Sequence, residues 1–353
     1  MSMADDRDML GLGKLPVDLL SDLLRTHAVT DPSVVVGPGV GRDAAIVDIG
    51  GQMLVVKTDP ITFATSSAPH YLVNINANDL ACLGAQPRWM LVTALFPAGE
   101  TTAADVARLF AELRSACAER GISLVGGHTE VTDAVVRPVF VGQLLGIAEP
   151  ERMLKPGGAR PGERLLLTRG VAIEGTALLA TEAAGTLRYA IGAGSLAAAA
   201  ALLHDPGLSV VRDAERLNRN GVVTALHDPT EGGIAMGVRE MAEASGCGAV
   251  VSRAAIIVRE ETQAIARALD LDPLGMLASG SLLAAVPADR MAEAETVCAE
   301  HQIPFAWIGK LTPAQHGFTL RDGERDLALP VFTTDEVARA LSLLGQTERE
   351  SSA

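Results

Sequence analysis

The sequence predicts a mixed α/β protein with two domains. Segments with helical spacing of apolar residues, such as 103–119, alternate with short segments rich in β-branched and aliphatic residues. The chain has 353 residues, enough for two domains of ordinary size. Residues 155–163 contain three glycines and two prolines, a composition typical of a linker. We therefore expect domains at 1–154 and 155–345, followed by a frayed tail at 346–353.

In the first half, helical spacing of apolar residues predicts a helix over 15–26. Two β-rich segments flank Gly50-Gly51, which predicts a hairpin with strands at 44–49 and 53–58. Further apolar patterns predict helices at 69–83 and 103–119, the second closed by Gly121. The remaining expected strands of this half are 122–125, which runs into Gly126-Gly127, and 135–147.

In the second half, short aliphatic segments predict strands at 164–168, 222–226, 281–286 and 305–308. Helices are expected at 173–184 and 231–244. The second of these helices begins at a glycine pair that follows a strand, as Gly126-Gly127 does in the first half. This repeated strand and Gly-Gly turn is weak evidence of internal duplication.

The composition restricts the class of partner. Hydrophobic residues make up 48% of the chain but aromatic residues only 3%, so the expected core is large and aliphatic. Acidic residues outnumber basic ones by 43 to 29, giving a net charge of −14. This balance argues against a surface that binds nucleic acid. It would also repel ATP, so a bound nucleotide would need a metal ion and local N–H groups.

The cysteines and the hydropathy predict a cytoplasmic protein. The four cysteines show no C-x-x-C spacing and read as reduced thiols; they are Cys82, Cys117, Cys247 and Cys298. The first eight residues are polar and acidic, unlike a signal peptide. No apolar run is expected to be long enough to span a membrane.

Five short motifs place an acidic residue beside small residues, at a predicted strand end or helix start. They are Gly41-Arg42-Asp43-Ala44-Ala45, Lys57-Thr58-Asp59-Pro60, Asn78-Asp79-Leu80-Ala81, Gly126-Gly127-His128-Thr129-Glu130 and His227-Asp228-Pro229-Thr230-Glu231-Gly232-Gly233. Magnesium prefers carboxylate and phosphate oxygens, and glycines let backbone N–H groups approach phosphates. No Walker motif occurs in the chain. The motifs therefore predict a magnesium–nucleotide site built without a P-loop.

Three of the aspartates are candidate metal ligands. Asp43 and Asp59 flank the predicted hairpin, and antiparallel pairing would bring them to the same end of the sheet. Two carboxylates at one edge need a cation, or one of them must be protonated. The alternative is that both are ordinary turn residues. Asp79 lies among small and apolar residues in a predicted helix, so it is a buried paired group or ligand, or else a solvated or capping residue.

Two glycine-containing motifs are candidate phosphate sites. Gly126-Gly127 could turn tightly beneath a phosphate, with Thr129 donating to it and Glu130 reaching a metal ion. The alternative is a plain strand-to-loop turn with His128 on the surface. Asp228 or Thr230 could cap the helix that begins near Glu231, whose N-terminus could hold an anion. Simple capping is the alternative for this motif.

The order of the five motifs resembles one superfamily over about residues 11–335. Its members include aminoimidazole ribonucleotide synthetase, the hydrogenase maturation factor HypE, selenophosphate synthetase and thiamine-monophosphate kinase. The chain is most similar to the HypE-like branch related to aminoimidazole ribonucleotide synthetase. Three segments carry this resemblance: Gly13-Lys14-Leu15-Pro16, residues 126–132 and Glu174-Gly175-Thr176-Ala177.

The resemblance implies an α/β (α+β) protein with the two-domain PurM-like fold. The N-terminal sheet would form a barrel across a homodimer, and the C-terminal domain would be an α/β sandwich. ATP with Mg²⁺ would lie between the domains, near the dimer interface. The implied metal ligands are Asp43, Asp59, Asp79 and Glu130. The implied nucleotide-binding residues are Lys57, Thr58, Asn78, Gly126, Gly127 and Thr129, and the catalytic candidates are Asp43, His128 and Asp228.

The implied activity is ATP-dependent transfer of the γ-phosphoryl group to an amide or carboxyl oxygen. The acceptor would be a small molecule or a residue of a partner protein, as in hydrogenase maturation. The chain ends in Glu350-Ser351-Ser352-Ala353 rather than the cysteine of HypE, and His128 and Glu231 stand where relatives usually have an acid and an arginine. A small-molecule kinase and a nucleotide-binding module without catalysis therefore remain alternatives.

Overall fold

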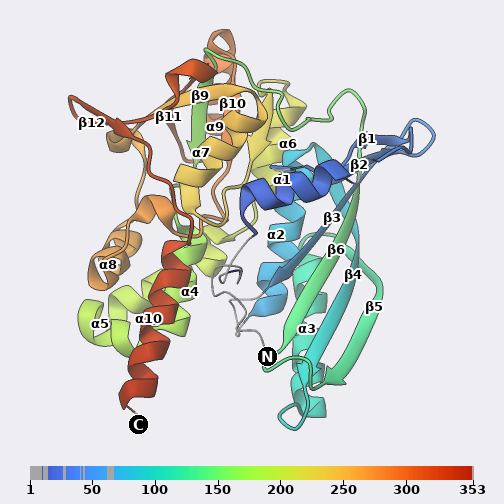
Figure 1. Cartoon of the computed structure of the whole chain (residues 1–353), viewed down its shortest axis with the longest axis vertical. Helices are drawn as coiled ribbons and strands as arrows, with labels where there is room; N and C mark the ends of the chain where they lie inside the picture. The colour runs from blue at the N-terminus through green and yellow to red at the C-terminus, as the bar shows by residue number, and fades with distance from the viewer. Residues whose placement is uncertain are drawn as a thin grey trace, which may run out of the picture.

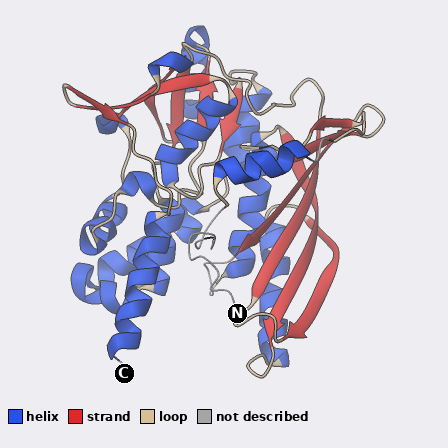
Figure 2. Ribbon diagram, viewed as in Figure 1, coloured by secondary structure: helices blue, strands red, loops and turns tan. Residues whose placement is uncertain are grey.

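The computed structural model describes residues 10, 15–26, 29–39, 41–42, 44–61 and 67–351. Two β-sheets occupy successive parts of the chain, one of six strands within 34–148 and one of seven strands within 164–328 (Figures 1 and 2). The predicted mixed α/β architecture is confirmed. Neither sheet closes into a barrel within the single chain.

The first sheet has the strand order β1-β2-β3-β6-β4-β5. Only β4 and β5 pair in parallel, and helix α3 (Ala103–Glu119) connects them, as a parallel pair requires. A capping box fixes the start of α3: Asp105 N donates to Thr102 Oγ1 and Thr102 N donates to Asp105 Oδ2. The strands are β1 (Val34–Val36), β2 (Ala45–Asp48), β3 (Met53–Ile61), β4 (Ala85–Pro97), β5 (Ser123–Thr132) and β6 (Val139–Ala148).

The predicted hairpin is confirmed, but its second strand is longer than expected. β2 and β3 pair antiparallel around Gly50 and Gly51, which both have positive φ. β3 continues to Ile61, so Lys57, Thr58 and Asp59 lie inside the strand rather than at its end. Successive side chains of a strand point to opposite faces. Lys57 is accordingly buried and Thr58 exposed.

Helix α2 (Ala68–Cys82) is the central element of the molecule (Figure 1). It packs against β3, β4 and β6 on one side and against α6 (Val211–Arg219) and β8 (Ala225–His227) on the other. Every residue of α2 except His70 is buried. A helix covered on all sides carries apolar residues all round. The polar residues Asn74, Asn76, Asn78 and Asp79 are thereby held inside the protein.

The expected Gly-Gly turn after residue 125 is wrong. β5 runs without interruption through Gly126 and Gly127 as the edge strand of the first sheet. A Cβ at Gly127 would lie 1.9 Å from the Val92 carbonyl oxygen, and φ at this glycine is +147°. The residue is therefore a glycine because strand β4 approaches its backbone closely. Without this turn, the two halves do not share the motif that hinted at duplication.

The second sheet has the order β13-β12-β9-β11-β7-β10-β8, with β9 and β12 as its parallel pair. Leu165, Leu166 and Leu167 of β7 are fully buried, as expected of a central strand covered on both faces. The new strands are β7 (Arg164–Thr168), β9 (Cys247–Ser252), β10 (Leu283–Val286), β11 (Phe305–Pro313), β12 (Phe318–Asp322) and β13 (Arg325–Ala328). The other helices are α1 (Val17–Thr26), α4 (Ile173–Glu182), α5 (Ala184–Ala201), α7 (Gly233–Ala244), α8 (Glu260–Leu269), α9 (Met291–Glu300) and α10 (Glu336–Ser351).

Two further expectations need correction: the frayed tail and the absence of a long apolar stretch. Helix α10 runs to Ser351, so the tail expected to be frayed from 346 is helical up to that residue. One stretch, Ala184–Arg219, is long and apolar enough to cross a membrane by length and composition, which no run was expected to be. Only 28% of its apolar window is buried, and non-helical backbone at Gly192 and Asp205 interrupts it.

Candidate functional site

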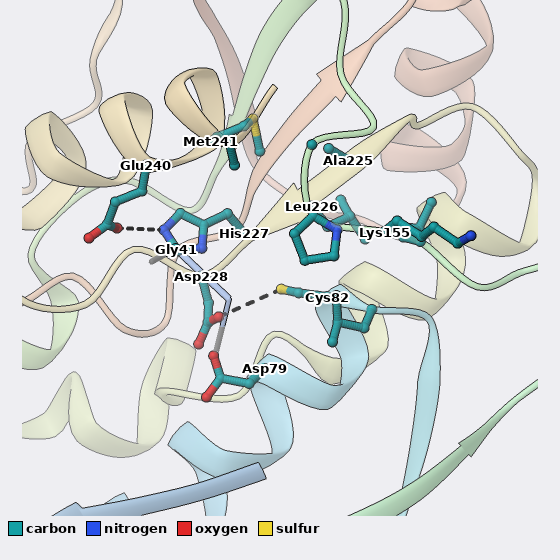
Figure 3. Close-up of a pocket in the computed structure, with 15 residues that line it drawn as sticks. Gly41, Asp79, Cys82, Lys155, Ala225, Leu226, His227, Asp228, Glu240 and Met241 are labelled. Atoms are coloured by element: carbon teal, nitrogen blue, oxygen red, sulfur yellow. Dashed lines mark hydrogen bonds and ion pairs between the residues drawn. The ribbon is translucent and has the colours of Figure 1, made fainter. Parts of the chain in front are cut away.

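A pocket lies between the two halves of the chain (Figure 3). It contains about 560 Å³ of empty space, including the part open to solvent. The end of α2, the segment after β6, strand β8 and helix α7 form its walls. The lining residues are Gly41, Asp79, Cys82, Leu83, Leu154, Lys155, Pro156, Gly157, Ala225, Leu226, His227, Asp228, Glu240, Met241 and Ala244. Three of the five sequence motifs, those that contain Gly41, Asp79 and Asp228, therefore meet here.

Lys57 links two of the predicted acidic residues. Its Nζ lies 2.9 Å from Asp79 Oδ2 and 3.3 Å from Asp59 Oδ2. Lys57 and Asp79 are only 8% and 7% exposed, whereas Asp59 is partly exposed. An ion pair this buried must be compensated, because each charge loses its hydration. Asp79 is therefore a buried paired group, and the interpretations of it as a solvated or capping residue are wrong.

Asp228 faces Asp79 from the other half of the chain. Asp228 follows β8 and is 1% exposed. In Figure 3 its carboxylate and that of Asp79 point toward one another. Cys82 lies one turn after Asp79 on α2, and its Sγ donates to Asp228 Oδ1 over 3.7 Å. The thiol thus bridges α2 and the loop that follows β8.

His227 and Glu240 form a pair in the same pocket that the sequence did not indicate. His227 Nε2 lies 2.9 Å from Glu240 Oε2, and the side chains are 15% and 35% exposed. His227 could have been suspected from its position beside Asp228. Glu240 could not, because only the packing of α7 beside β8 brings it to the histidine.

The N-terminus of α7 is stabilised by Asp335, a residue distant in sequence, and not by a capping side chain from the loop that precedes the helix. Gly232, in a left-handed conformation, is the N-cap of α7, so neither Asp228 nor Thr230 caps this helix as the sequence suggested. Gly232 N instead donates to Asp335 Oδ2 over 2.7 Å. Burial raises the pKa of Asp335 to about 6, although bonds from backbone N–H groups oppose the increase.

Glu174, in the first turn of α4, is the other strongly perturbed acid of this region. It is 5% exposed, and burial raises its pKa from 4.5 to about 7, against hydrogen bonding from Ser279. The charges of Asp335 and Glu231 raise it further.

These shifts predict a pH-dependent stability. Between pH 4.5 and about 7 the folded chain keeps a proton on Glu174 that the unfolded chain has released, so stability falls as the pH rises through this range. The loss from this residue should be about 3 kcal/mol. Urea unfolding at pH 5 and pH 8 measures it. Glu174→Gln should remove most of the difference, and an unchanged difference in that variant would contradict the assignment.

Asn78 uses its whole side-chain amide to join the two halves. Its Nδ2 donates to the Leu208 carbonyl oxygen and its Oδ1 accepts from Val210 N, both over 2.9 Å. Asn78 is fully buried. The residue was expected to bind the nucleotide, whereas the bonds it makes here are to backbone of the second half.

Replacing Asn78 by alanine should destabilise the protein by about 2–4 kcal/mol, because two buried backbone groups lose their partner. Asn78→Asp should cost less than the alanine variant, because its protonated carboxyl group can still donate to Leu208 O and accept from Val210 N. Urea denaturation measures both changes, with the exposed Asn220→Ala as the control. An alanine variant as stable as the parent would show that these bonds do not hold the halves together.

The structure separates the β5 motif from the pocket. β5 lies three strands from β3, roughly 14 Å at ordinary strand spacing. His128 Nε2 contacts Glu130 Oε2 over 3.1 Å, and both side chains are more than half exposed. Gly126, Gly127 and Thr129 are exposed on the same strand. Asp43, a predicted metal ligand and catalytic residue, lies outside the described residues.

Two family models match the chain, one to each half. The N-terminal domain of AIR synthase related proteins matches residues 41–148, and the C-terminal domain of the same family matches residues 160–321. Together the two matches span most of the chain and contain both sheets except for their edge strands β1 and β13.

Curated relatives agree with this match. The carbamoyl dehydratase HypE of Azotobacter vinelandii is 31% identical over 256 residues, which cover 70% of this chain and 72% of that protein. A putative hydrogenase expression/formation protein of Methanocaldococcus jannaschii is 24% identical over 330 residues, covering 90% and 95% of the two chains.

A solved structure supports the fold. The hydrogenase maturation protein HypE in complex with ATP superimposes with a TM-score of 0.68 at 24% identity, covering 86% of this chain and 92% of that one. This similarity identifies the two-domain PurM-like fold. The family models and the relatives together show that this chain belongs to the AIR synthase related family, and HypE proteins are among its relatives.

Proposed function

We propose that this protein is an ATP-dependent, magnesium-requiring enzyme of the HypE type. It would transfer the γ-phosphoryl group of ATP to an amide or carboxyl oxygen, on a small molecule or on a residue of a partner protein. Phosphorylation would turn that oxygen into a leaving group. A cytoplasmic location fits this activity, since its substrate ATP is a cytoplasmic metabolite.

The observation that carries the proposal is the meeting of Asp79 and Asp228 across the pocket. One aspartate comes from each half of the chain, and both are buried. Lys57 supplies a buried ammonium group beside Asp79. Phosphoryl transfer depends on positioning and on neutralising the charge of the phosphates. Carboxylates from two domains around one pocket suit a metal–nucleotide complex bound between those domains.

The acidic residues fit a magnesium ion in type and in charge. Lys57 contributes one positive charge against the three carboxylates of Asp59, Asp79 and Asp228, so these four residues sum to −2. Mg²⁺ commonly takes one or two carboxylates and completes its shell with water and phosphate oxygens. Among the described residues, no three His, Cys, Asp or Glu side chains lie close enough together to hold a metal ion. A magnesium ion here would therefore need phosphate oxygens and water as further ligands. Asp79 and Asp228 would hold the ion together with phosphate oxygens and water, Asp59 would add its negative charge nearby, and the ion would neutralise phosphate charge.

The names of the relatives favour this reaction over its rivals. Several relatives of this chain are carbamoyl dehydratases, others are selenide, water dikinases, and a structural neighbour was solved with ATP. A kinase of the thiamine-monophosphate type and a non-catalytic nucleotide-binding module remain the alternatives. Glu231, in the place of an arginine, is the feature of the motif that favours the non-catalytic alternative.

A homodimer would give the β5 motif a role in binding the nucleotide. β5 is an exposed edge strand, and its Val125 and Val131 are 54% and 56% exposed. An unpaired apolar edge favours pairing with another strand. Two copies joined through their first sheets would form a shared barrel and bring Gly126, Gly127 and Thr129 toward the partner's nucleotide. Light scattering on the purified protein tests the dimer.

Product analysis distinguishes the three functions. The protein is incubated with MgATP and a panel of primary carboxamides and carboxylic acids, and ADP is measured together with the organic product. ADP with a dehydrated or cyclised product supports the proposal. A stable phosphoryl ester indicates a kinase. Nucleotide binding without ADP release from any acceptor indicates the non-catalytic module.

A further inference from the structure

A second cleft, here called the Arg88 cleft, lies between the two halves of the chain. It contains about 950 Å³ of empty space, including the part open to solvent. The end of α2 and the segment 149–157 line both this cleft and the pocket of Asp79 and Asp228, so the two cavities are neighbours. The residues that line the Arg88 cleft are Ala81, Gly84, Ala85, Gln86, Pro87, Arg88, Ile147, Glu149, Arg152, Val211, Glu215, Asn218 and Arg219.

The walls of the Arg88 cleft are joined by close contacts. Asn218 of α6 is 9% exposed, and its Nδ2 donates to the Arg152 carbonyl oxygen over 2.7 Å. Gly84, just after α2, has a φ of +80°, and a Cβ there would lie 2.2 Å from the same oxygen. Leu154 N donates to the Leu83 carbonyl oxygen over 3.1 Å. The end of α2, the segment after β6 and helix α6 are therefore packed together, and the fold determines the shape of the cleft.

An irregularity in strand β4 accounts for the position of Arg88. Pro87 pairs with Gly146 of β6 and Trp89 pairs with Leu145, so Arg88 is an extra residue between two consecutive pairs. Such a β-bulge changes the direction of a side chain and is common beside functional sites. The bulge thus places Arg88 at the cleft.

The guanidinium group of Arg88 contacts an aromatic ring and, within the part of the chain that the structure describes, no carboxylate. Its Cζ lies 4.7 Å from the centroid of the Trp89 ring. A guanidinium group stacked in this way is held by the ring, and the N–H groups at its edge can still donate in its plane. Arg88 therefore offers a fixed, permanently charged donor group to a ligand in the cleft.

The other charged residues of the cleft form two neutral pairs. Arg152 Nε lies 3.1 Å from Glu149 Oε2, and Arg219 Nη2 contacts Glu215. Arg88 adds one positive charge, so the lining of the cleft sums to +1 in a chain of net charge −14. A guanidinium group has five N–H donors and a bidentate carboxylate takes two of them, so the paired arginines also keep donors for a ligand.

The neighbouring pocket has the opposite charge balance. Its charged lining residues are Asp79, Asp228, Glu240 and Lys155, which sum to −2 when His227 is neutral. Like charges repel, so an anion without a bound metal ion is disfavoured in that pocket and favoured in the Arg88 cleft.

We propose that the Arg88 cleft binds a small molecule through an oxyanion group, which is a phosphate or a carboxylate. Guanidinium groups bind both of these groups through paired N–H···O bonds. Arg88 would bind the anion directly, and Arg152 and Arg219 would supply further donors. The site is separate from the metal–nucleotide pocket, and the inference does not depend on the proposed function.

Calorimetric titration of inorganic phosphate and of acetate into the full-length protein tests the site. EDTA is present and the ionic strength is held constant with chloride, so no metal ion carries the anion into the neighbouring pocket. Arg88→Gln removes the charge and keeps a polar side chain at an exposed position, so the variant should fold, which its thermal transition verifies. Arg108→Gln is the matched control, because Arg108 is an exposed arginine of α3 whose partner is Glu112.

We expect at least one of the two anions to bind the parent, Arg88→Gln to weaken that binding at least tenfold, and the control to bind like the parent. Tighter binding of phosphate would identify a phosphate-bearing ligand, and tighter binding of acetate a carboxylate-bearing one. Equal affinity in the parent and Arg88→Gln, or no binding of either anion at up to about 10 mM, would overturn the site. Asp79→Asn should leave the anion affinity unchanged, and a changed affinity would place the anion in the other pocket instead.

Discussion

Asp228→Asn is expected to lower ATP-dependent turnover at least about 100-fold while the protein stays folded. The substitution keeps the shape of the side chain and a carbonyl oxygen for Cys82, but it removes a buried negative charge that faces Asp79 across the pocket. Without that charge, the metal–nucleotide complex loses a contact with the second half of the chain. ADP release under saturating MgATP measures the effect.

Asp322→Asn is the matched control for this variant. Asp322 is a partly exposed residue of β12 in the second sheet, and its contact with Arg253 is 3.7 Å long. Turnover in the control should equal that of the parent. Parent-like turnover in Asp228→Asn would remove this residue from the reaction, and with it the case for a site built from both halves.

Gly127→Ala should destabilise the protein by at least about 3 kcal/mol, among the larger effects of a single substitution. The new Cβ would lie 1.9 Å from the Val92 carbonyl oxygen, and the backbone has a φ of +147° that alanine rarely adopts. The pairing of β4 with β5 would have to shift. The free energy of unfolding in urea gives the magnitude.

The neighbouring glycine provides a control of the same kind. A Cβ at Gly126 would meet only Leu91 Cδ2 at 3.8 Å, an ordinary contact. Gly126→Ala should therefore change stability by less than about 1 kcal/mol. If the two alanine variants were equally stable, the close approach of β4 to Gly127 would be ruled out.

Elements with strong local signals were predicted well from the sequence. Helix α3 has a regular apolar stripe, a capping box at Thr102 and a glycine at its end, and its bounds of 103–119 match the prediction. Strand β7 also has the predicted bounds, because its aliphatic run is flanked by polar and glycine-containing segments. In both cases the local sequence and the packing favour the same structure.

Strand β5 was mispredicted because the reason for its glycines is not local. A Gly-Gly pair after a short β-rich segment is usually a turn. Here Gly127 is required by the carbonyl group of Val92, a residue 35 positions away in sequence that becomes its neighbour only when β4 and β5 pair. Periodicity alone does not contain that information.

The acidic residues of the candidate site could be predicted from the sequence, but the residues that pair with them could not. Asp79 stands out as an acid inside an apolar helix, and Asp228 as part of a glycine-containing motif. The role of Lys57 at the centre of the ion pairs depends on β3 crossing beside α2. Glu240 reaches His227 only through the packing of α7 beside β8, so its pairing could not be predicted from the sequence.

Calorimetric titration of ATP, with and without magnesium, on the parent protein and on Asp79→Asn tests the central claim most directly. The account predicts binding near one site per subunit that depends on magnesium and weakens at least tenfold in the variant. ATP affinity that depends on neither magnesium nor Asp79, or no binding of ATP at all, would contradict a metal–nucleotide site between the two halves.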